Sequence, residues 1–479
     1  MTVDDAINQF VAPVSNVIFN FVFTPVSLPA GQEAPVILLW LIAAGVFFTL
    51  FMGFPNLRHI GKAFDALRGK HDHLEDKNPA GQITRFQALA TTLSGTVGLG
   101  NIAGVAVAIS IGGPGAMVWM IITGLLGMST KFMESTMAVK YRREFEDGHV
   151  SGGPMYYIRD SFLKRGWDKI GLVLASFFAF CCIFAAIGAG NLFQANQFAS
   201  QLIVVTGGED SFFADKGWIV GLFLAAIVGV VIIGGIESIA KVASKIVPIM
   251  GGLYLLCGLI IVAKNFANIP EAFEIVVSSA FTAKAGLGGL IGAMIQGVQR
   301  GAFSNEAGFG TGAMPHACVK TSEPISQGLV AMIGPFVDTV IICTVTALVI
   351  VVSGVYQTSP DITGVQLTSQ AFAETLSWFP YLLAMAVGLF AFSTMISWSY
   401  YGLKAVTFFF NESKYAELTY KIFYSFCAVI GATASLEAVI QFADAMLFAM
   451  TVPNIICLYV LSREIKGDLK SYLARIKEA

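Results

Sequence analysis

The chain has 479 residues, of which 56% are hydrophobic and only 13% are charged. A soluble domain of ordinary composition carries about 25% charged residues, so these proportions exclude a mainly water-facing surface and indicate an integral membrane protein. The formal net charge of -2 comes without a basic patch, and nothing in it indicates a nucleic acid partner.

The N-terminal segment, residues 1–34, is predicted to lie on the extracytoplasmic side of the membrane. Residues 1–10 are acidic, whereas a signal peptide begins with a positively charged region. The apolar stretch from Phe10 to Phe23 is flanked by prolines and is too short to cross about 30 Å of hydrocarbon. An interfacial helix is therefore expected there.

Eleven transmembrane helices are predicted when a window of about 19 residues is moved along the chain. The first, over 35–55, is an extra helix ahead of two groups of five. The other ten are expected near 88–111, 115–138, 170–203, 217–236, 245–263, 286–312, 328–353, 379–403, 417–435 and 438–461. This fold class is an all-α integral membrane protein, with a first repeat over 86–263, a second over 286–461 and a cytoplasmic tail over 462–479.

The orientation follows from the positive charges. Most of the 29 Lys and Arg residues fall in loops that this arrangement places on one side of the membrane. An excess of Lys and Arg marks the cytoplasmic side, so the N-terminus is expected outside and the C-terminus in the cytoplasm. The expected location is the inner (plasma) membrane of a bacterial-type cell.

Two predicted spans contain glycines and polar residues near their centres, one from Thr92 to Gly104 and one from Arg300 to Gly312. A glycine costs about 1 kcal/mol of helix propensity relative to alanine, and polar groups exposed to lipid are expensive. The two spans begin on opposite sides of the membrane and lie five spans apart. They therefore predict two broken helices in a five-plus-five inverted repeat, an arrangement that places binding sites near the bilayer midplane.

Close helix packing is the alternative reason for glycines in membrane helices, but it does not explain the polar residues beside them. A broken helix offers free N–H groups and the positive end of a half-helix, which attract a carboxylate. Freed carbonyls and the oxygens of Ser, Thr and Asn suit a hard cation. The two breaks thus predict a secondary active transporter for an amino acid zwitterion and a cation.

Four motifs of the chain resemble those of the alanine or glycine:cation symporter family, also called the sodium:alanine symporter family. They are Gly98–Ala106, Gly112–Met120, Ser151–Tyr157 and Arg300–Gly308. The resemblance covers nearly the whole chain. It implies symport of a small neutral amino acid, alanine or glycine, with a cation, by alternating access. Na⁺ is the expected coupling ion and H⁺ the alternative; the lipid bilayer and the amino acid are the expected partners.

The stretch from Thr96 to Asn101 is also similar to the first core helix of neurotransmitter:sodium symporters, which share an inverted-repeat fold. This similarity implies that the N–H groups of Leu99 and Gly100 hold the substrate carboxylate. Phe303 and Trp398 are the expected walls around the substrate side chain. The substrate-binding residues so implied are Thr96, Gly98, Leu99, Gly100, Asn101, Gln296, Phe303, Ser304 and Trp398.

The same similarity implies a Na⁺ site formed by the carbonyls of Ser94 and Val97 and by two hydroxyls of the ninth span. Thr394 and Ser397 are three residues apart, so both lie on one face of a helix. Elsewhere in the predicted spans, Arg300, Glu306 and Asp338 are the most deeply placed ionisable residues. A pair of Arg300 with Asp338 or Glu306 and a gating role are both open interpretations.

Two other classes of membrane protein are alternatives to a symporter. A channel or facilitator for a small neutral solute such as ammonia would also fit eleven spans, but all five histidines fall in predicted cytoplasmic loops. A membrane-embedded enzyme would need a nucleophile with a base, or metal ligands, and the sequence contains no HExxH, GxSxG or His/Cys cluster. The protein is therefore expected to be a transporter and not an enzyme.

Overall fold

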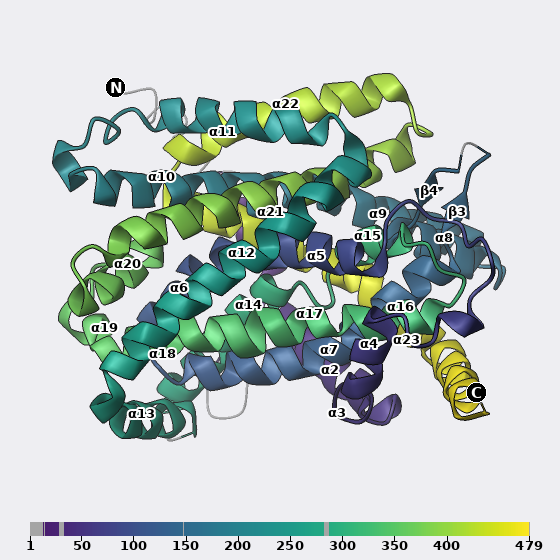
Figure 1. Ribbon diagram of the computed structural model, residues 1–479, viewed down its shortest axis with the longest axis horizontal. Helices are drawn as coiled ribbons and strands as arrows, with labels where there is room; N and C mark the ends of the chain where they lie inside the picture. Colours follow the sequence, from purple (N-terminus) through teal and green to yellow (C-terminus); the bar gives the residue numbers. More distant parts are fainter. Residues whose placement is uncertain (1–12, 14, 28–32, 147, 282–286, 479) are drawn as a thin grey trace.

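The structure is a computed structural model that describes residues 13, 15–27, 33–146, 148–281 and 287–478. Within these ranges the chain is mostly helical, and its long helices lie side by side (Figure 1). Two small antiparallel sheets accompany the helices. The strands are β1 (Pro25–Ser27) paired with β2 (Glu33–Pro35), and β3 (Arg143–Glu144) paired with β4 (Val150–Ser151).

Six helices within the described residues are long and apolar enough to cross a membrane, and a bent pair would make a seventh. The six are α7 (Ala116–Lys140), α9 to α10 (Asp168–Val205), α12 (Gly235–Lys264), α16 to α18 (Pro324–Ser353), α21 (Phe379–Phe409) and α23 (Leu436–Glu478). The bent pair is α5 (Arg85–Thr96) with η2 (Leu99–Asn101) and α6 (Ala103–Gly112). The chain is thus a multi-pass membrane protein.

The four remaining predicted spans coincide with shorter helices: α2 (Val36–Phe51), α11 (Gly217–Ile232), α14 (Leu287–Asn305) and α22 (Lys414–Thr433). The number of eleven spans stays a prediction. Smaller helices connect them: α3 (Pro55–Arg58), α4 (Ile60–Leu67), η1 (Asp72–Leu74), α8 (Pro154–Leu163), η4 (Gly208–Asp210), η5 (Phe266–Asn268), α13 (Ile269–Phe281), α15 (Ala313–Ala317), α19 (Val355–Thr358) and α20 (Gly364–Thr375).

The N-terminal segment is described only in part. Residues 1–12, 14 and 28–32 of the predicted extracytoplasmic segment lie outside the described residues, while 15–22 are helical, with Val17 and Phe21 exposed. At the other end of the chain, the predicted tail 462–479 continues as helix α23 up to Glu478.

Both helix breaks occur where the sequence predicts them. The first broken helix begins with a capping box at Thr84 and Gln87, and it bends by 56° between α5 and α6. In the second, α14 ends at Asn305 and α15 begins only at Ala313. Between these ends the chain turns through positive φ angles of 56°, 94° and 76° at Glu306, Gly308 and Gly310. Glycine adopts such angles without steric cost, which explains why the segment is glycine-rich.

Two spans contain π-helical turns. One is η3 (Gly188–Leu192), between α9 (Asp168–Ile187) and α10 (Phe193–Val205). The other is η7 (Phe336–Cys343), preceded by α16 (Pro324–Ala331) and α17 (Ile333–Pro335) and followed by α18 (Thr344–Ser353). Such turns are rare and often occur at functional sites. Of the polar side chains that contact the first break, Asp338 lies in η7 and Gln194 lies in α10, two residues after η3.

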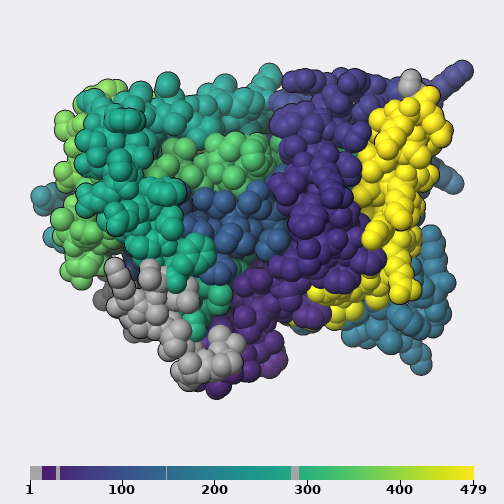
Figure 2. Space-filling view, turned by 90° about the horizontal axis from the view of Figure 1, so that it is seen from below, coloured from purple at the N-terminus to yellow at the C-terminus, as the bar shows by residue number. Residues whose placement is uncertain are grey.

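The two broken helices pack against each other through α6 and α14, and α7 covers α14. Helix α5 packs against α12 and α21. The extra helix α2 lies outside this group, against α7 and α23. There Phe48 contacts Tyr459, with ring centroids 4.9 Å apart, and Figure 2 shows the N-terminal part of the chain in purple beside the yellow helix α23.

Candidate functional site

The first break is buried and is held by side chains from other helices. Asn101 closes it locally, because its Oδ1 accepts a hydrogen bond of 3.0 Å from the Gly98 N–H. The Leu99 N–H, predicted to hold a substrate carboxylate, donates to Gln194 Oε1 across 3.1 Å. Gln194 was not predicted as a site residue. Its signal was the run of amide residues in an apolar span, Asn191, Gln194, Asn196, Gln197 and Gln201.

The predicted cation ligands come from α5 and α21, and two of them are in contact. Thr394 Oγ1 donates to the carbonyl of Ser94 across 3.0 Å, and Ser94 Oγ donates to the carbonyl of Ser393 across 2.7 Å. A Cβ on Gly98 would lie 2.4 Å from Thr394 Oγ1, so only glycine allows this approach. Carbonyl and hydroxyl oxygens are the ligands that hard cations prefer.

Ser397 and Thr96 carry buried hydroxyls that have no hydrogen-bond partner in the described part of the chain. Buried polar groups in folded proteins nearly always have a partner, so an oxygen left over beside the break suits a ligand. Val97, the remaining predicted cation ligand, is buried, and its N–H donates to the carbonyl of Leu93 across 2.7 Å. The residues present therefore fit a small cation bound by oxygen atoms.

One residue from each broken helix contacts Asp338, which lies on the π-helical turn η7. Asn101 Nδ2 donates to the Asp338 carbonyl across 3.1 Å and also to its Oδ1. Ser304 Oγ and Thr339 Oγ1 each donate to Asp338 Oδ2 across 2.7 Å. Among the ion pairs of the described residues none includes Asp338, and the side chains that donate hydrogen bonds to this buried carboxylate are neutral.

The two predicted wall residues reach the first break from either side of it. A Cβ on Gly100 would lie 3.2 Å from the Phe303 ring, and Phe303 packs edge to face on Phe193, with ring centroids 5.4 Å apart. Trp398 Nε1 donates to the carbonyl of Gly95 across 3.2 Å. Phe303 therefore contacts the chain after the break, and Trp398 contacts it before the break.

Gln296 is placed elsewhere. It is half-buried, and its Cβ would lie 2.8 Å from a Cβ on Gly112, at the far end of α6 from the break. Its neighbour in the next turn, Gln299, is the amide that takes part in a buried polar cluster. Gln299 Nε2 donates to Asp444 Oδ2 across 2.8 Å.

Arg300 forms its ion pair with Asp444 of α23. The sequence leaves a pair with Asp338 or Glu306 open beside a gating role, and Arg300 pairs with neither of them among the described residues. The reason is that each of those carboxylates has other donors: Asp338 is held by Asn101, Ser304 and Thr339, and Glu306 accepts from Thr311 beyond the end of α14. Asp444 is fully buried. The sequence feature that could have indicated Asp444 is that it is the only acidic residue inside the predicted span 438–461.

The second break is held by Glu134 of α7. Its Oε1 accepts hydrogen bonds from the Gly308 N–H at 2.9 Å, the Gly310 N–H at 3.1 Å and Asn454 Nδ2 at 2.8 Å. One turn earlier, Lys131 Nζ donates to the carbonyl of Glu306 across 3.3 Å. Lys131 and Glu134, both fully buried, were not predicted, although a Lys and a Glu three residues apart in an apolar span were a visible signal.

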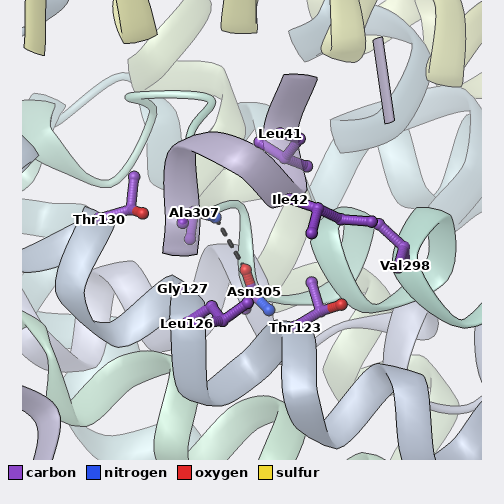
Figure 3. Close-up of a pocket in the computed structure, with 10 residues that line it drawn as sticks. Leu41, Ile42, Thr123, Leu126, Gly127, Thr130, Val298, Asn305 and Ala307 are labelled. Atoms are coloured by element: carbon purple, nitrogen blue, oxygen red, sulfur yellow. Dashed lines mark hydrogen bonds between the residues drawn. The ribbon is translucent and has the colours of Figure 1, made fainter. Parts of the chain in front are cut away.

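A small cavity lies beside this break, between α2, α7 and α14 (Figure 3). Its volume of about 20 Å³ admits one water molecule and excludes an amino acid. Asn305 lines it: its Oδ1 accepts from the Ala307 N–H across 2.9 Å, and its Nδ2 has no partner among the described residues.

His316 corrects one sequence-based expectation. It lies in helix α15 and is fully buried, whereas the sequence places it in a cytoplasmic loop. The sequence predicts a span that ends at residue 312 and a cytoplasmic loop after it, and α15, with only five residues, is too short to be predicted as a helix there. The His316 ring bonds to Gln327 of α16 and not to a second histidine, so it does not form the paired histidines expected of an ammonia channel.

A polar network joins the predicted cytoplasmic end of α21 to the β3–β4 hairpin and α8. Lys404 Nζ donates to Ser151 Oγ across 2.7 Å and contacts Glu412 Oε2 at 3.3 Å, while the Tyr156 hydroxyl donates to Glu412 Oε1 across 2.9 Å. Burial acts to raise the pKa of Glu412, but the Lys404 charge and these hydrogen bonds outweigh burial and lower the pKa below its ordinary value.

The solved structure of MhsT in complex with L-phenylalanine has the same fold. It superposes with a TM-score of 0.57 at 14% identity, over 80% of this chain and 90% of that one. At this identity the likeness concerns the fold alone.

Two curated proteins are similar in sequence over most of their length. The sodium/alanine symporter AgcS of Methanococcus maripaludis is 40% identical over 91% of this chain and 94% of its own. The probable sodium/glutamine symporter GlnT of Bacillus subtilis is 33% identical over 92% of this chain and 88% of its own.

The family model of the sodium:alanine symporters matches residues 20–479. Its members and the similar proteins are transporters and not enzymes, in agreement with the sequence-based expectation. With both helix breaks, the shared fold and a match over almost its whole length, this chain belongs to the sodium:alanine symporter family.

Proposed function

We propose that this protein imports a small neutral amino acid, alanine or glycine, together with Na⁺, by alternating access. The observation that carries the proposal is the contact of 3.0 Å between Thr394 Oγ1 and the Ser94 carbonyl. Ser397, one turn further along α21, has a buried hydroxyl without a hydrogen-bond partner among the described residues. The family match and the 40% identity to a sodium/alanine symporter support the same conclusion.

The cation site proposed here uses the oxygens of Ser94, Val97, Thr394 and Ser397. Na⁺ would lie between the Thr394 hydroxyl oxygen and the Ser94 carbonyl oxygen, with the Thr394 hydroxyl rotated so that its proton points away from the ion. Because Ser94 belongs to α5 and Thr394 to α21, bound Na⁺ would tie the half-helix to the neighbouring span. Release of the ion would leave hydrogen bonds such as those of Ser94 with Thr394 and Ser393 between the two helices, so α5 would move more readily, as alternating access requires.

The substrate carboxylate is proposed to lie at Leu99 and Gly100, at the start of the second half of the broken helix. Backbone N–H groups at such an end attract negative charge. The Leu99 N–H is bonded to Gln194 Oε1, so substrate binding would displace the Gln194 side chain. Its freed amide NH₂ could then donate to the carboxylate, which adds Gln194 to the proposed site.

Small size of the substrate is proposed from the aromatic residues at the break. Phe303 lies within 3.2 Å of the position of a Cβ on Gly100, and Trp398 is buried against Gly95 and Gly190. Both residues are therefore proposed to limit the substrate to a short side chain. The similar proteins include one named for alanine and one named for glutamine, so the side-chain pocket is where members of the family are expected to differ.

The proposed architecture is eleven spans with the N-terminus outside and the C-terminus in the cytoplasm, in two inverted repeats of five. Its support is a matching pattern of helix contacts. The last span of the first repeat, α12, packs on α21 of the second, and α23 packs in the same way on α9. Likewise α11 packs on α21, and α22 on α10. In the proposed repeats α9 to α10 corresponds to α21, α11 to α22 and α12 to α23. Within each of these two pairs of contacts, one contact is therefore the counterpart of the other.

The test is counterflow and uptake of labelled alanine in proteoliposomes of purified protein. Uptake should follow an inward Na⁺ gradient, and excess unlabelled alanine or glycine should compete with the label. If uptake does not depend on Na⁺ and follows a proton gradient, the coupling ion is H⁺. The Asp338 carboxylate would then be the first candidate for the proton-binding group. Rapid, gradient-independent flux of ammonia without amino acid uptake would overturn symport in favour of a channel.

A further inference from the structure

An apolar groove lies on the outer surface of the first broken helix, away from its polar break residues. Its volume is about 230 Å³. Its lining comes from α5, α12 and η7: Phe86, Leu89, Ala90, Leu93, Val97, Val247, Pro248, Gly251, Gly252, Leu255, Val337 and Ile342. None of these side chains is polar. A zwitterion or an ion in the groove would lose its hydration and gain no hydrogen bonds in exchange, so the groove suits a hydrocarbon chain.

Missing side chains on α12 create the opening. A Cβ on Gly251 or on Gly252 would meet nothing within 4 Å, so the groove is open at two consecutive residues. Pro248 and Gly252 are exposed, and Phe86 on the opposite wall is 48% exposed. The groove is therefore reached from the surface of the membrane domain, where lipid tails are the solvent.

The length of the groove matches one leaflet of a bilayer. From Phe86 to Val97 there are eleven residue steps, which at 1.5 Å each make about 16 Å along α5. Half of a hydrocarbon core of about 30 Å is about 15 Å. Because α5 starts at the cytoplasmic side in the proposed orientation, the groove runs from the cytoplasmic interface to the level of the helix break.

Two lysines extend the groove at its cytoplasmic end. Lys241, Lys245, Pro248 and Gly252 follow one another at spacings of four, three and four residues, which puts them on one face of α12. Both lysines are exposed, and neither belongs to an ion pair in the described ranges of the chain. Lys side chains beside the cytoplasmic leaflet attract anionic lipid headgroups. The two lysines thus lie beyond the cytoplasmic end of the apolar groove, as the charged headgroup of a phospholipid lies beyond its acyl tail.

We propose that one anionic phospholipid of the cytoplasmic leaflet binds here, with its phosphate at Lys241 and Lys245 and an acyl tail between α5 and α12. The tail would contact the side chain of Val97. If the proposed Na⁺ site is correct, this is the residue whose carbonyl faces the ion, so an occupied groove would hold α5 in its sodium-binding position. The lipid site itself stands on the groove and the lysines alone.

Native mass spectrometry of the purified protein tests the binding directly. The parent protein, freed of lipid and then titrated with phosphatidylglycerol, should retain one molecule tightly and should bind phosphatidylcholine at least fivefold more weakly. Gly251→Leu with Gly252→Leu fills the groove and should lose that molecule. Lys241→Gln with Lys245→Gln should keep a lipid but lose most of the preference for phosphatidylglycerol.

Matched controls lie on the same chain. Ile249→Ala with Leu256→Ala changes exposed apolar residues of α12 that do not line the groove, and Lys264→Gln removes an exposed lysine at the other end of α12. Both should retain lipid as the parent does. Leu93→Trp fills the groove from α5 and replaces the double variant if that variant does not elute as a single folded species.

Equal lipid retention by the parent and by a folded groove-filling variant would overturn the proposal, as would equal affinity of the parent for the two phospholipids. Because lipid retention is measured without transport, its failure is distinct from failure of the proposed symport. Conversely, loss of the lipid together with a higher Na⁺ requirement for uptake would support the contact through Val97.

Discussion

The Thr394 hydroxyl donates a hydrogen bond of 3.0 Å to the Ser94 carbonyl and so joins α21 to α5 at the end of that half-helix. A return bond of 2.7 Å runs from Ser94 Oγ to the carbonyl of Ser393. Two segments three hundred residues apart in the chain are therefore fixed to each other at the proposed cation site. Removal of a hydroxyl that binds the cation should therefore weaken cation binding more than it lowers the stability of the fold.

Thr394→Ala or Ser397→Ala should raise the Na⁺ concentration that gives half-maximal alanine uptake. A hydrogen bond or ligand to a charged group contributes about 1.5–3 kcal/mol, so the increase should be about 10- to 150-fold. Ser399→Ala is the matched control, because Ser399 Oγ donates across 2.6 Å to the Ile396 carbonyl within its own helix. An unchanged Na⁺ requirement in both variants would remove these hydroxyls from the site.

Phe303→Ala should admit longer aliphatic amino acids. One methylene in an apolar pocket is worth about 1–3 kcal/mol, so competition by valine and leucine against labelled alanine should improve by steps as the side chain lengthens. Phe162→Ala is the control, since Phe162 of α8 is buried away from both breaks, against Trp167 with ring centroids 5.7 Å apart. The same ranking of competitors in parent and Phe303→Ala protein would show that Phe303 is not the wall.

The Arg300 and Asp444 pair gives a stability prediction. Asp444→Asn leaves a buried guanidinium without its counter-charge, which costs about 3–5 kcal/mol. The variant should unfold at a clearly lower temperature in detergent, whereas Asp361→Asn, in an exposed turn, should not. Arg300→Met combined with Asp444→Leu removes both charges and should recover most of the loss. If the double variant loses as much stability as Arg300→Met alone and Asp444→Leu alone together, the two residues are not coupled.

The helix breaks could be predicted from the sequence because their cause is local. Glycines and polar residues within one short stretch are costly in a membrane helix, whichever helices surround it. The partners could not be predicted in the same way. Gln194 and Glu134 bind the breaks from other spans, and Asp444 binds Arg300 of α14 in the same way. Which face of a helix meets which neighbour depends on the packing of the whole bundle. An Asp inside an apolar span indicates that it has a partner, but the sequence does not show which residue that partner is.

Glu412 gives a prediction on pH. Because its pKa is lowered in the folded protein from the ordinary value of 4.5, its contribution to stability is complete above that value and is lost as the pH falls through the lowered pKa. The contribution is about 0.5–1 kcal/mol, as for partly exposed ion pairs. The melting temperature of the parent should therefore fall below pH 4.5 more steeply than that of Glu412→Gln. Parallel melting curves over pH 3–6 would contradict the role given to the Lys404 contact.

The proposed carboxylate site can be tested through the backbone. Ordinary substitution cannot remove an N–H group, but a methyl group on Gly100 would lie 3.2 Å from Phe303 Cδ1 and 3.7 Å from Ser304 Cα. It would push the Phe303 ring and occupy space that the substrate carboxylate needs. Gly100→Ala should therefore lose alanine binding in calorimetry or scintillation proximity measurements while the protein stays folded.

The control for Gly100→Ala must be a glycine with room for a methyl group. Gly124, although in an unbroken helix, is unsuitable because a Cβ there would lie 3.0 Å from the Thr339 side chain, next to Asp338. Gly334→Ala meets nothing within 4 Å and should bind alanine as the parent does. If Gly100→Ala also binds with parental affinity, the carboxylate lies elsewhere. Arg300 would then be the first candidate, because its Nε and Nη1 have no partner among the described residues.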